Sequence, residues 1–194
     1  MGILGGTFDP IHYGHLMVAE AAREKFLLDK VIFMPTNIPP HKHGIITDFW
    51  HRYLMVTLAI LGNPFFEASC LEYERGGITY TVDTLRQLRQ SYGDAAELFF
   101  ITGVDTILDL FGWKEPEELL SLCKFIVAAR PGLDFHIIGE IFGKYYRSVV
   151  LPMEMPQLDI SSSDIRKRIK EGRSIKYLVP ESVEQYIIQQ KLYI

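Results

Sequence analysis

The stretch Gly2-Ile3-Leu4-Gly5-Gly6-Thr7-Phe8-Asp9-Pro10-Ile11-His12-Tyr13-Gly14-His15 sets the fold class to expect. Its first residues are apolar or glycine and predict an abbreviated strand, which runs directly into a glycine-rich turn. From Gly14 to Leu27 apolar residues recur at helical spacing. The sequence therefore predicts a strand, a turn and a helix in immediate succession.

Strands and helices alternate through the rest of the chain. Further strands are predicted at 30–35, 65–71, 97–102, 125–129 and 149–152, and several of them are continuous apolar runs, which is typical of strands covered on both faces. Asp48 and Thr81 are predicted to cap two helices, and Pro116 fits the first turn of another. Further helices are predicted at 105–111, 134–146, 162–171 and 181–191. The helix after Asp48 carries Trp50, Leu54, Leu58 and Leu61 on one side.

This alternation predicts an α/β fold: a doubly wound, mostly parallel Rossmann-like sheet with helices on both faces. The 194 residues suit a single domain (1–194), with a small C-terminal helical part from about residue 161. In such sheets ligands bind beyond the carboxyl ends of the strands, where the polar segments of this sequence follow.

Composition excludes several classes of protein. Lys and Arg number 20 against 24 Asp and Glu, a net charge of −4, which speaks against binding to nucleic acid or to an anionic membrane surface. The longest apolar run is far shorter than the ~20 residues of a membrane span. Cys70 and Cys123 stand singly, without a CxxC spacing or a signal peptide, and are predicted to be reduced core residues of a cytoplasmic protein.

The glycine-rich turn predicts an anion site, most plausibly for phosphate, because a helix start offers unpaired N–H groups and a positive dipole end. It matches neither a Walker P-loop nor the dinucleotide G-x-G-x-x-G pattern. His12 and His15 face the same way on a helix start, and Gly14 between them leaves room for a phosphate. The segment also fits a helix cap with a buried histidine, or a metal pair, although no third ligand is near.

Two motifs of the sequence resemble the signatures of a known superfamily. Gly6-Thr7-Phe8-Asp9-Pro10 with His12-x-Gly14-His15 resembles the signature of the nucleotidyltransferase superfamily that moves an adenylyl or cytidylyl group between phosphates. Ile160-Ser161-Ser162-Ser163-Asp164-Ile165-Arg166 resembles the second signature of that superfamily, although alone it reads as a capped surface helix. Four more segments narrow the resemblance to bacterial nicotinate-nucleotide adenylyltransferases: 39–42 (PPHK), 79–84 (TYTVDT), 103–105 (GVD) with Trp113 beyond it, and 129–132 (ARPG).

The resemblance implies transfer of AMP from ATP to nicotinate mononucleotide, giving deamido-NAD and pyrophosphate, with Mg²⁺ carried on the ATP phosphates and no metal ligand assigned to the protein. The catalytic residues that it implies are His12, His15, Lys42 and Arg166. Those implied for ATP are Gly6, Thr7, Phe8, His12, His15, Gly103, Asp105, Ser161, Ser162, Ser163 and Arg166. Those implied for nicotinate mononucleotide are His41, Lys42, Thr81, Trp113 and Arg130.

Individually, these residues have plainer interpretations. Trp113 fits ordinary packing, Asp105 a helix cap, and Lys42 and Arg130 solvated charges. Lys114 departs from the pattern, because some relatives carry a tyrosine there, so a backbone contact to the nicotinate carboxylate could survive but a ring contact could not.

The implied chemistry needs no protein base, because the 5′-phosphate of the acceptor is already ionised at neutral pH. Two alternatives stay open: a sister adenylyl- or cytidylyltransferase with another phosphate acceptor, and a nucleotide-binding sensor without turnover. The sequence also leaves open whether the chain forms a homo-oligomer and how strongly it prefers nicotinate over nicotinamide.

Overall fold

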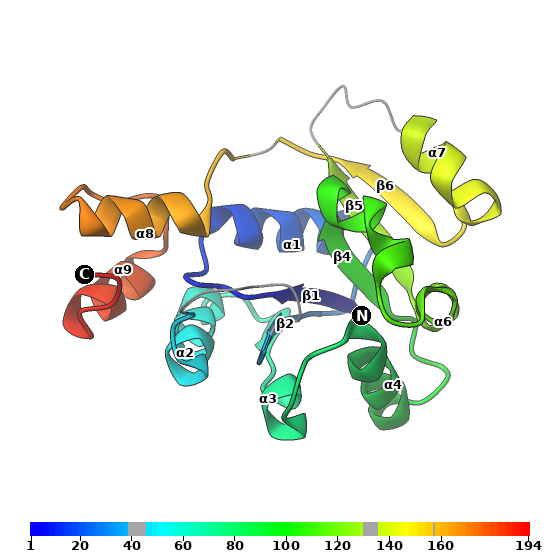
Figure 1. The fold of residues 1–194 in the computed structure, drawn as a ribbon, viewed down its shortest axis with the longest axis horizontal. Helices are drawn as coiled ribbons and strands as arrows, with labels where there is room; N and C mark the ends of the chain where they lie inside the picture. The colour runs from blue at the N-terminus through cyan, green and yellow to red at the C-terminus, as the bar shows by residue number, and fades with distance from the viewer. Residues whose placement is uncertain (39–45, 130–135, 157) are drawn as a thin grey trace.

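A computed structural model of the chain describes residues 1–38, 46–129, 136–156 and 158–194. Its described strands form one parallel sheet in the order β3-β2-β1-β4-β5-β6 (Figure 1). Their bounds are β1 Gly2–Gly6, β2 Val31–Pro35, β3 Phe66–Ala68, β4 Phe99–Gly103, β5 Lys124–Ala129 and β6 Val150–Glu154. The chain winds outward from β1 to β3 and then returns to the other side of β1 with β4. The predicted doubly wound sheet is confirmed, with its switch point between β1 and β4.

Helices cover both faces of this sheet. They are α1 Tyr13–Lys25, α2 Phe49–Ile60, α3 Leu71–Arg75, α4 Thr81–Tyr92, α5 Val104–Leu108, α6 Pro116–Leu122, α7 His136–Phe142, α8 Ser162–Lys170 and α9 Glu181–Gln189, with 3₁₀ turns at Leu110–Gly112 and Gly143–Tyr145. Neighbouring residues of β1 face opposite ways: Leu4 packs in one buried cluster with α1, α2, α8 and α9, and Ile3 in a second with α4, α6 and α7. Figure 1 shows α8 and α9 at the end of the molecule opposite β6 and α7.

Helix α2 buries a different side from the one that its apolar pattern marks. Asp48 caps it as predicted, accepting from the backbone N–H of Trp50 at 2.9 Å. Trp50, Leu54 and Leu61 are nevertheless exposed. The buried side holds Phe49, Arg52, Met55, Val56 and Ile60. An arginine fits there because its guanidinium donates to backbone carbonyls, which a pattern based on polarity does not reveal.

The segment predicted as a strand at 65–71 divides into two elements. Only Phe66–Ala68 pairs as β3, and the chain turns into α3, where the Ser69 hydroxyl accepts from the N–H of Leu71 at 3.3 Å. Cys70 lies at this turn, partly exposed, with its thiol 3.1 Å from a Glu74 carboxylate oxygen, so its prediction as a core residue is wrong.

Several smaller predictions have mixed outcomes. Cys123 is buried as expected, and burial raises the pKa of its thiol to about 12. Both thiols are free. Thr81 is the first residue of α4 and not its cap, which is Tyr80. The predicted start of the 134–146 helix lies outside the described residues. Within the described ranges, none of the helices has the length and apolar character needed to cross a membrane.

Candidate active site

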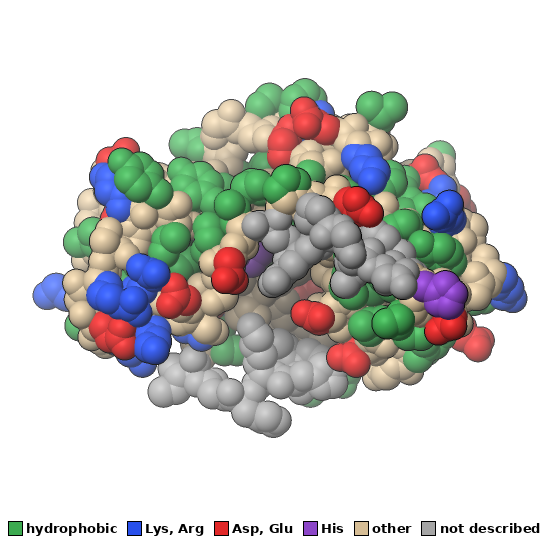
Figure 2. Space-filling view, turned by 90° about the horizontal axis from the view of Figure 1, so that it is seen from above, with side chains coloured by type: hydrophobic (Ala, Val, Ile, Leu, Met, Phe, Trp, Pro, Cys, Tyr) green, Lys and Arg blue, Asp and Glu red, His purple; other side chains and the backbone are tan. Residues whose placement is uncertain are grey.

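A cavity of about 910 Å³ opens at the carboxyl edge of the sheet, where β1 and β4 diverge. Gly5 and Gly6 bring the end of β1 to its wall, and Thr102 and Gly103 bring the end of β4. The space-filling view shows a hollow in one face, with acidic side chains on its rim and a histidine at its wall (Figure 2). The sheet topology thus places this cavity at the switch point, where nucleotides bind in folds of this type.

His12 and His15 form a stacked pair at the start of α1 and line this cavity. Their ring centroids are 3.6 Å apart, and the backbone N–H of His12 donates to Nδ1 of His15 at 3.2 Å. Because Nδ1 of His15 accepts this bond, its proton in the neutral ring is on Nε2, which is then a donor. The two side chains therefore lie side by side in the cavity wall, as their spacing in the sequence predicted.

His12 is almost completely buried, with 6% of its surface exposed, and burial lowers the pKa of its imidazole to about 4. The ring is consequently neutral at pH 7. Its Nδ1 has no hydrogen-bond partner within the described part of the chain.

Gly14 makes room for the His12 ring itself. A Cβ at Gly14 would lie 3.0 Å from Nδ1 of His12 and 3.1 Å from its Cε1, closer than carbon side chains normally approach. Behind the pair, Phe8 is buried with its ring edge-on to His15 at 5.0 Å. The glycine and the phenylalanine of the first motif therefore fix where the two imidazoles lie.

The second motif packs directly onto the first. Ser162, the first residue of α8, donates through its hydroxyl to the carbonyl of Pro10 at 2.8 Å. Arg166, one turn further along α8, donates through Nη1 to the carbonyl of Asp9 at 2.6 Å. These contacts join residues more than 150 positions apart in the sequence. The two motifs, which stand near opposite ends of the sequence, are therefore in direct contact in the folded chain.

The other two serines of this motif stabilise α8. Ser161 accepts from the N–H of Asp164 at 3.1 Å as the helix cap, and Ser163 accepts from Nη2 of Arg166 at 3.4 Å. Neither these serines nor Arg166 lines the cavity, whereas Ile160, immediately before them, does.

The opposite wall of the cavity contains four more predicted site residues: Thr81, Gly103, Asp105 and Trp113. Trp113 follows the 3₁₀ turn after α5, and its indole meets the ring of Phe100 edge-on, at 6.1 Å and 85°. Together with Gly6 and the two histidines, these residues surround one space. Thr7 and Phe8 lie beside that space and not in its wall, and His41, Lys42 and Arg130 lie outside the described residues.

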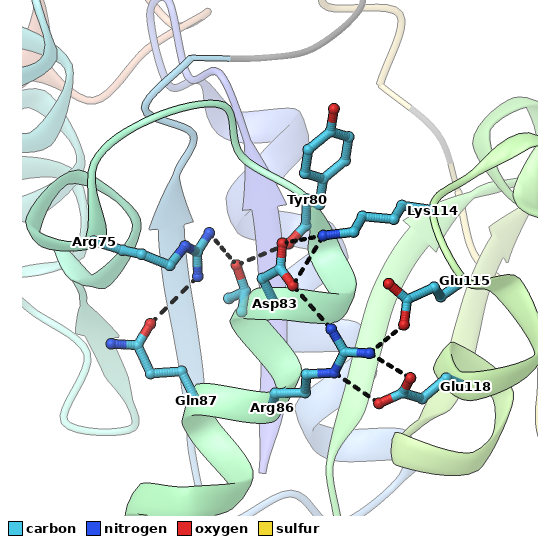
Figure 3. A network of polar contacts seen from close by, with 9 residues as sticks. Arg75, Tyr80, Asp83, Arg86, Gln87, Lys114, Glu115 and Glu118 are labelled. Atoms are coloured by element: carbon cyan, nitrogen blue, oxygen red, sulfur yellow. Dashed lines mark hydrogen bonds and ion pairs between the residues drawn. The ribbon is translucent and has the colours of Figure 1, made fainter.

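A polar network that the sequence analysis did not predict connects the turn after Trp113 to α4 (Figure 3). Lys114 pairs with Asp83 at 2.9 Å and lies 4.8 Å from the ring centre of Tyr80. Arg86 pairs with Asp83 at 3.0 Å and also with Glu115 and Glu118. Each pair is partly exposed and individually weak. As a connected set they hold the turn that carries Trp113 against the helix that begins with Thr81.

Glu72 is a further cavity residue that the sequence reading missed. It is 5% exposed, its Oε1 accepts from the hydroxyl of Thr84 at 2.8 Å, and that hydroxyl accepts from Arg75 at 3.0 Å. Burial raises the pKa of its carboxyl to about 7, although Thr84 and Arg75 oppose the shift. No sequence signal marks it, because the surrounding segment was not expected to be helical.

The raised pKa of Glu72 predicts a pH-dependent stability difference. Between about pH 4.5 and pH 7 the folded chain keeps a proton on Glu72 and the unfolded chain does not. The free energy of unfolding therefore falls as the pH rises through this range, and the stabilisation from protonated Glu72 is lost once the pH exceeds about 7. Glu72→Gln cannot ionise. The free energy of unfolding of the variant, relative to wild type, should therefore rise by about 2 kcal/mol between pH 5 and pH 8, measured by urea denaturation.

Glu74→Gln, an exposed carboxylate two residues further on, is the matched control and should show no such rise. A Glu72→Gln difference that is the same at both pH values would contradict the shift.

Comparison with known proteins places this site in a family. The Cytidylyltransferase-like family model matches residues 3–168. A protein of Thermoanaerobacter sp. (strain X514) named probable nicotinate-nucleotide adenylyltransferase is 52% identical over 197 residues, covering 100% of this chain and 93% of that protein. The chain belongs to the nicotinate-nucleotide adenylyltransferase family. A second family member of the same name, from Moorella thermoacetica, is 48% identical over 100% of this chain and 91% of its own length.

Solved structures in the nicotinate-nucleotide adenylyltransferase family agree with this assignment. The nicotinic acid mononucleotide adenylyltransferase of Plasmodium falciparum complexed with NaAD has a TM-score of 0.81 at 28% identity, covering 99% of this chain and 96% of that one. The same enzyme complexed with APC has a TM-score of 0.78 at 26% identity over the same shares. The family resemblance drawn from the motifs is confirmed.

Proposed function

We propose that this chain transfers AMP from ATP to nicotinate mononucleotide and releases pyrophosphate and deamido-NAD. The observation that carries the proposal is the single cavity that joins the His12–His15 pair on one wall to Trp113 and Thr81 on the other. One wall supplies donors for phosphate, and the other supplies an aromatic surface beside a helix N-terminus. Family membership and a relative solved with NaAD support the same reaction.

On the ATP side, Nε2 of His15 and the His12 ring are proposed to donate to oxygens of the α- and β-phosphates, with backbone groups of Gly6, Thr7 and Phe8 nearby. Charge grows on these oxygens as the bond to pyrophosphate breaks, so fixed donors stabilise the transition state more than the ground state. The acceptor phosphate attacks without a protein base, because it is already an anion. The remaining task of the protein is alignment.

The ribose and the triphosphate tail have their own proposed contacts. Gly103 and Asp105, at the end of β4 and the start of α5, suit the adenosine ribose because a carboxylate accepts from hydroxyl groups. The α8 motif of Ser161, Ser162, Ser163 and Arg166 is proposed for the triphosphate tail. A guanidinium has five N–H donors, and the contacts of Arg166 to Asp9 and Ser163 do not use all of them.

On the acceptor side, Trp113 is proposed to stack on the pyridine ring. The carboxylate of nicotinate would lie near the hydroxyl of Thr81 and the N-terminal N–H groups of α4, which favour an anion. His41, Lys42 and Arg130 are proposed for the phosphate of the mononucleotide.

Mg²⁺ is proposed to enter with ATP as part of the substrate, held by phosphate oxygens and water, as is usual for this ion. In the residues described, no three His, Cys, Asp or Glu side chains gather into a group that could hold a metal ion. This donor set fits an ion delivered by the nucleotide better than a resident one.

A pyrophosphate-release assay tests the function. The acceptors are nicotinate mononucleotide, nicotinamide mononucleotide and phosphopantetheine, each supplied with ATP or CTP. The highest kcat/KM is expected for nicotinate mononucleotide with ATP. Turnover confined to another acceptor would instead identify a sister transferase, and ATP binding without turnover would identify a sensor.

Trp113→Ala should raise the KM for nicotinate mononucleotide about 10-fold and change the KM for ATP less than twofold. The reason is that one aromatic stacking contact is worth about 1–3 kcal/mol. Steady-state kinetics with each substrate varied in turn measures both constants. Trp50→Ala, which removes the exposed indole on α2, is the control. Equal effects of Trp113→Ala on both KM values would show that Trp113 is a packing residue only.

A further inference from the structure

A layer of buried polar side chains holds the phosphate loop, residues 6–11, from the side away from the cavity. Asp9 is 6% exposed and does not line the cavity. One of its carboxylate oxygens accepts from the hydroxyl of Tyr193 at 2.6 Å, and the other faces the N–H of Thr47 at 3.4 Å. Tyr193 thus reaches an acidic residue of the first motif from 184 positions away in the sequence.

Arg52 is the cation of this layer and is 2% exposed. Its guanidinium donates to the carbonyl of Thr7 at 2.8 Å and to the carbonyl of Thr47 at 2.9 Å. Burial lowers the pKa of Arg52, and the charge of Asp9 opposes that shift. A buried arginine keeps its charge, so Asp9 and Arg52 form a mutually compensating pair of charges beneath the loop.

Three carbonyl groups of the loop accept hydrogen bonds from side chains. The carbonyl of Thr7 accepts from Arg52, that of Asp9 from Arg166, and that of Pro10 from Ser162. In a trans peptide the carbonyl and the next N–H point in opposite directions, so holding the Thr7 carbonyl turns the N–H of Phe8 away from Arg52. The orientation of the Phe8 N–H is therefore set by Arg52, a side chain that does not line the cavity.

We propose that Tyr193 is a positioning residue for phosphate binding, acting through Asp9 on the geometry of this loop. The inference rests on the proposed function. Removing the hydroxyl would leave one oxygen of a buried carboxylate without its donor, and Asp9 would move to find another. Such a shift would tilt the loop beside His12 and His15. A small misplacement of groups around the reacting phosphates weakens stabilisation of the transition state most.

Tyr193→Phe tests the proposal, with Tyr186→Phe as the matched control. The Tyr186 hydroxyl bonds to His51 at 2.8 Å on the α2–α9 contact, so the control also removes a tyrosine hydroxyl from the C-terminal part but leaves the loop alone. Tyr193→Phe should lower kcat for adenylyl transfer about 10-fold, with the KM for nicotinate mononucleotide within twofold of wild type. Tyr186→Phe should retain the wild-type kcat, and both variants should melt at similar temperatures.

A double-mutant cycle with Asp9→Asn shows whether Tyr193 acts through Asp9. If it does, the double variant should have about the same kcat as Asp9→Asn alone, because the second change removes a contact that the first has already altered. Multiplying losses, or a kcat of Tyr193→Phe equal to that of Tyr186→Phe, would overturn the positioning role while leaving the proposed function in place. A wild-type chain without any adenylyl transfer would overturn the proposed function, and this inference with it.

Discussion

His15→Ala should lower kcat for adenylyl transfer about 100-fold or more, the cost of losing one fixed donor to a developing negative charge. The side chain combines two features that support this expectation. Its Nδ1 is occupied by the backbone N–H of His12, and its ring is held by the edge of Phe8, so the Nε2 donor has a fixed direction before ATP binds. Single-turnover measurements with saturating ATP give the rate of the chemical step directly.

The control for this variant is His51→Ala, which removes an imidazole on α2 that does not line the cavity. It should keep kcat within twofold of wild type. A His15→Ala protein that is folded to the same degree and has a kcat within threefold of wild type would remove His15 from the mechanism. Restoring part of the activity with His15→Gln, whose amide can donate from a similar position, would confirm that the hydrogen-bond donor is what matters.

Gly14→Ala is expected to lower kcat/KM for ATP about 100-fold, through the imidazole pair and not through the fold. The new Cβ would lie 3.0 Å from Nδ1 of His12, and that ring cannot step aside easily because it is buried and stacked on His15. A displacement of about 1 Å at reacting groups is enough for a loss of this size. Steady-state kinetics with ATP varied measures it.

Alanine is a better helix former than glycine by about 1 kcal/mol, so the melting temperature of Gly14→Ala should not fall in proportion to its activity. Gly62→Ala is the matched control, because a Cβ there has open space within 4 Å. It should leave activity unchanged. Wild-type activity in Gly14→Ala would show that the His12 ring is free to move without consequence.

The sheet and the phosphate loop were predictable because their signals are local. Continuous apolar runs mark the strands, and the glycines after β1 mark the turn that lies at the cavity wall. The helix caps at Asp48 and Ser161 follow from neighbouring residues alone, and both are confirmed.

The parts that were missed depend on residues distant in sequence. Arg52 faces inward because its guanidinium donates hydrogen bonds to the carbonyls of Thr7 and Thr47. Polarity alone would instead place an arginine at the surface. Glu72 is buried by a short helix, α3, that has no strong pattern of its own. Similarly, the contacts of Arg86 with Glu115 and Glu118 join two helices whose packing only the folded chain defines.

The joining of the two motifs also bears on how the site forms during folding. The contacts from Ser162, Arg166 and Tyr193 to the phosphate loop span 152, 157 and 184 residues. Closing chain loops of that length is entropically costly and comes late relative to local structure. We therefore expect the end of the molecule where the two motifs meet to form late in folding. Recovery of activity after dilution from denaturant should lag behind recovery of helical signal.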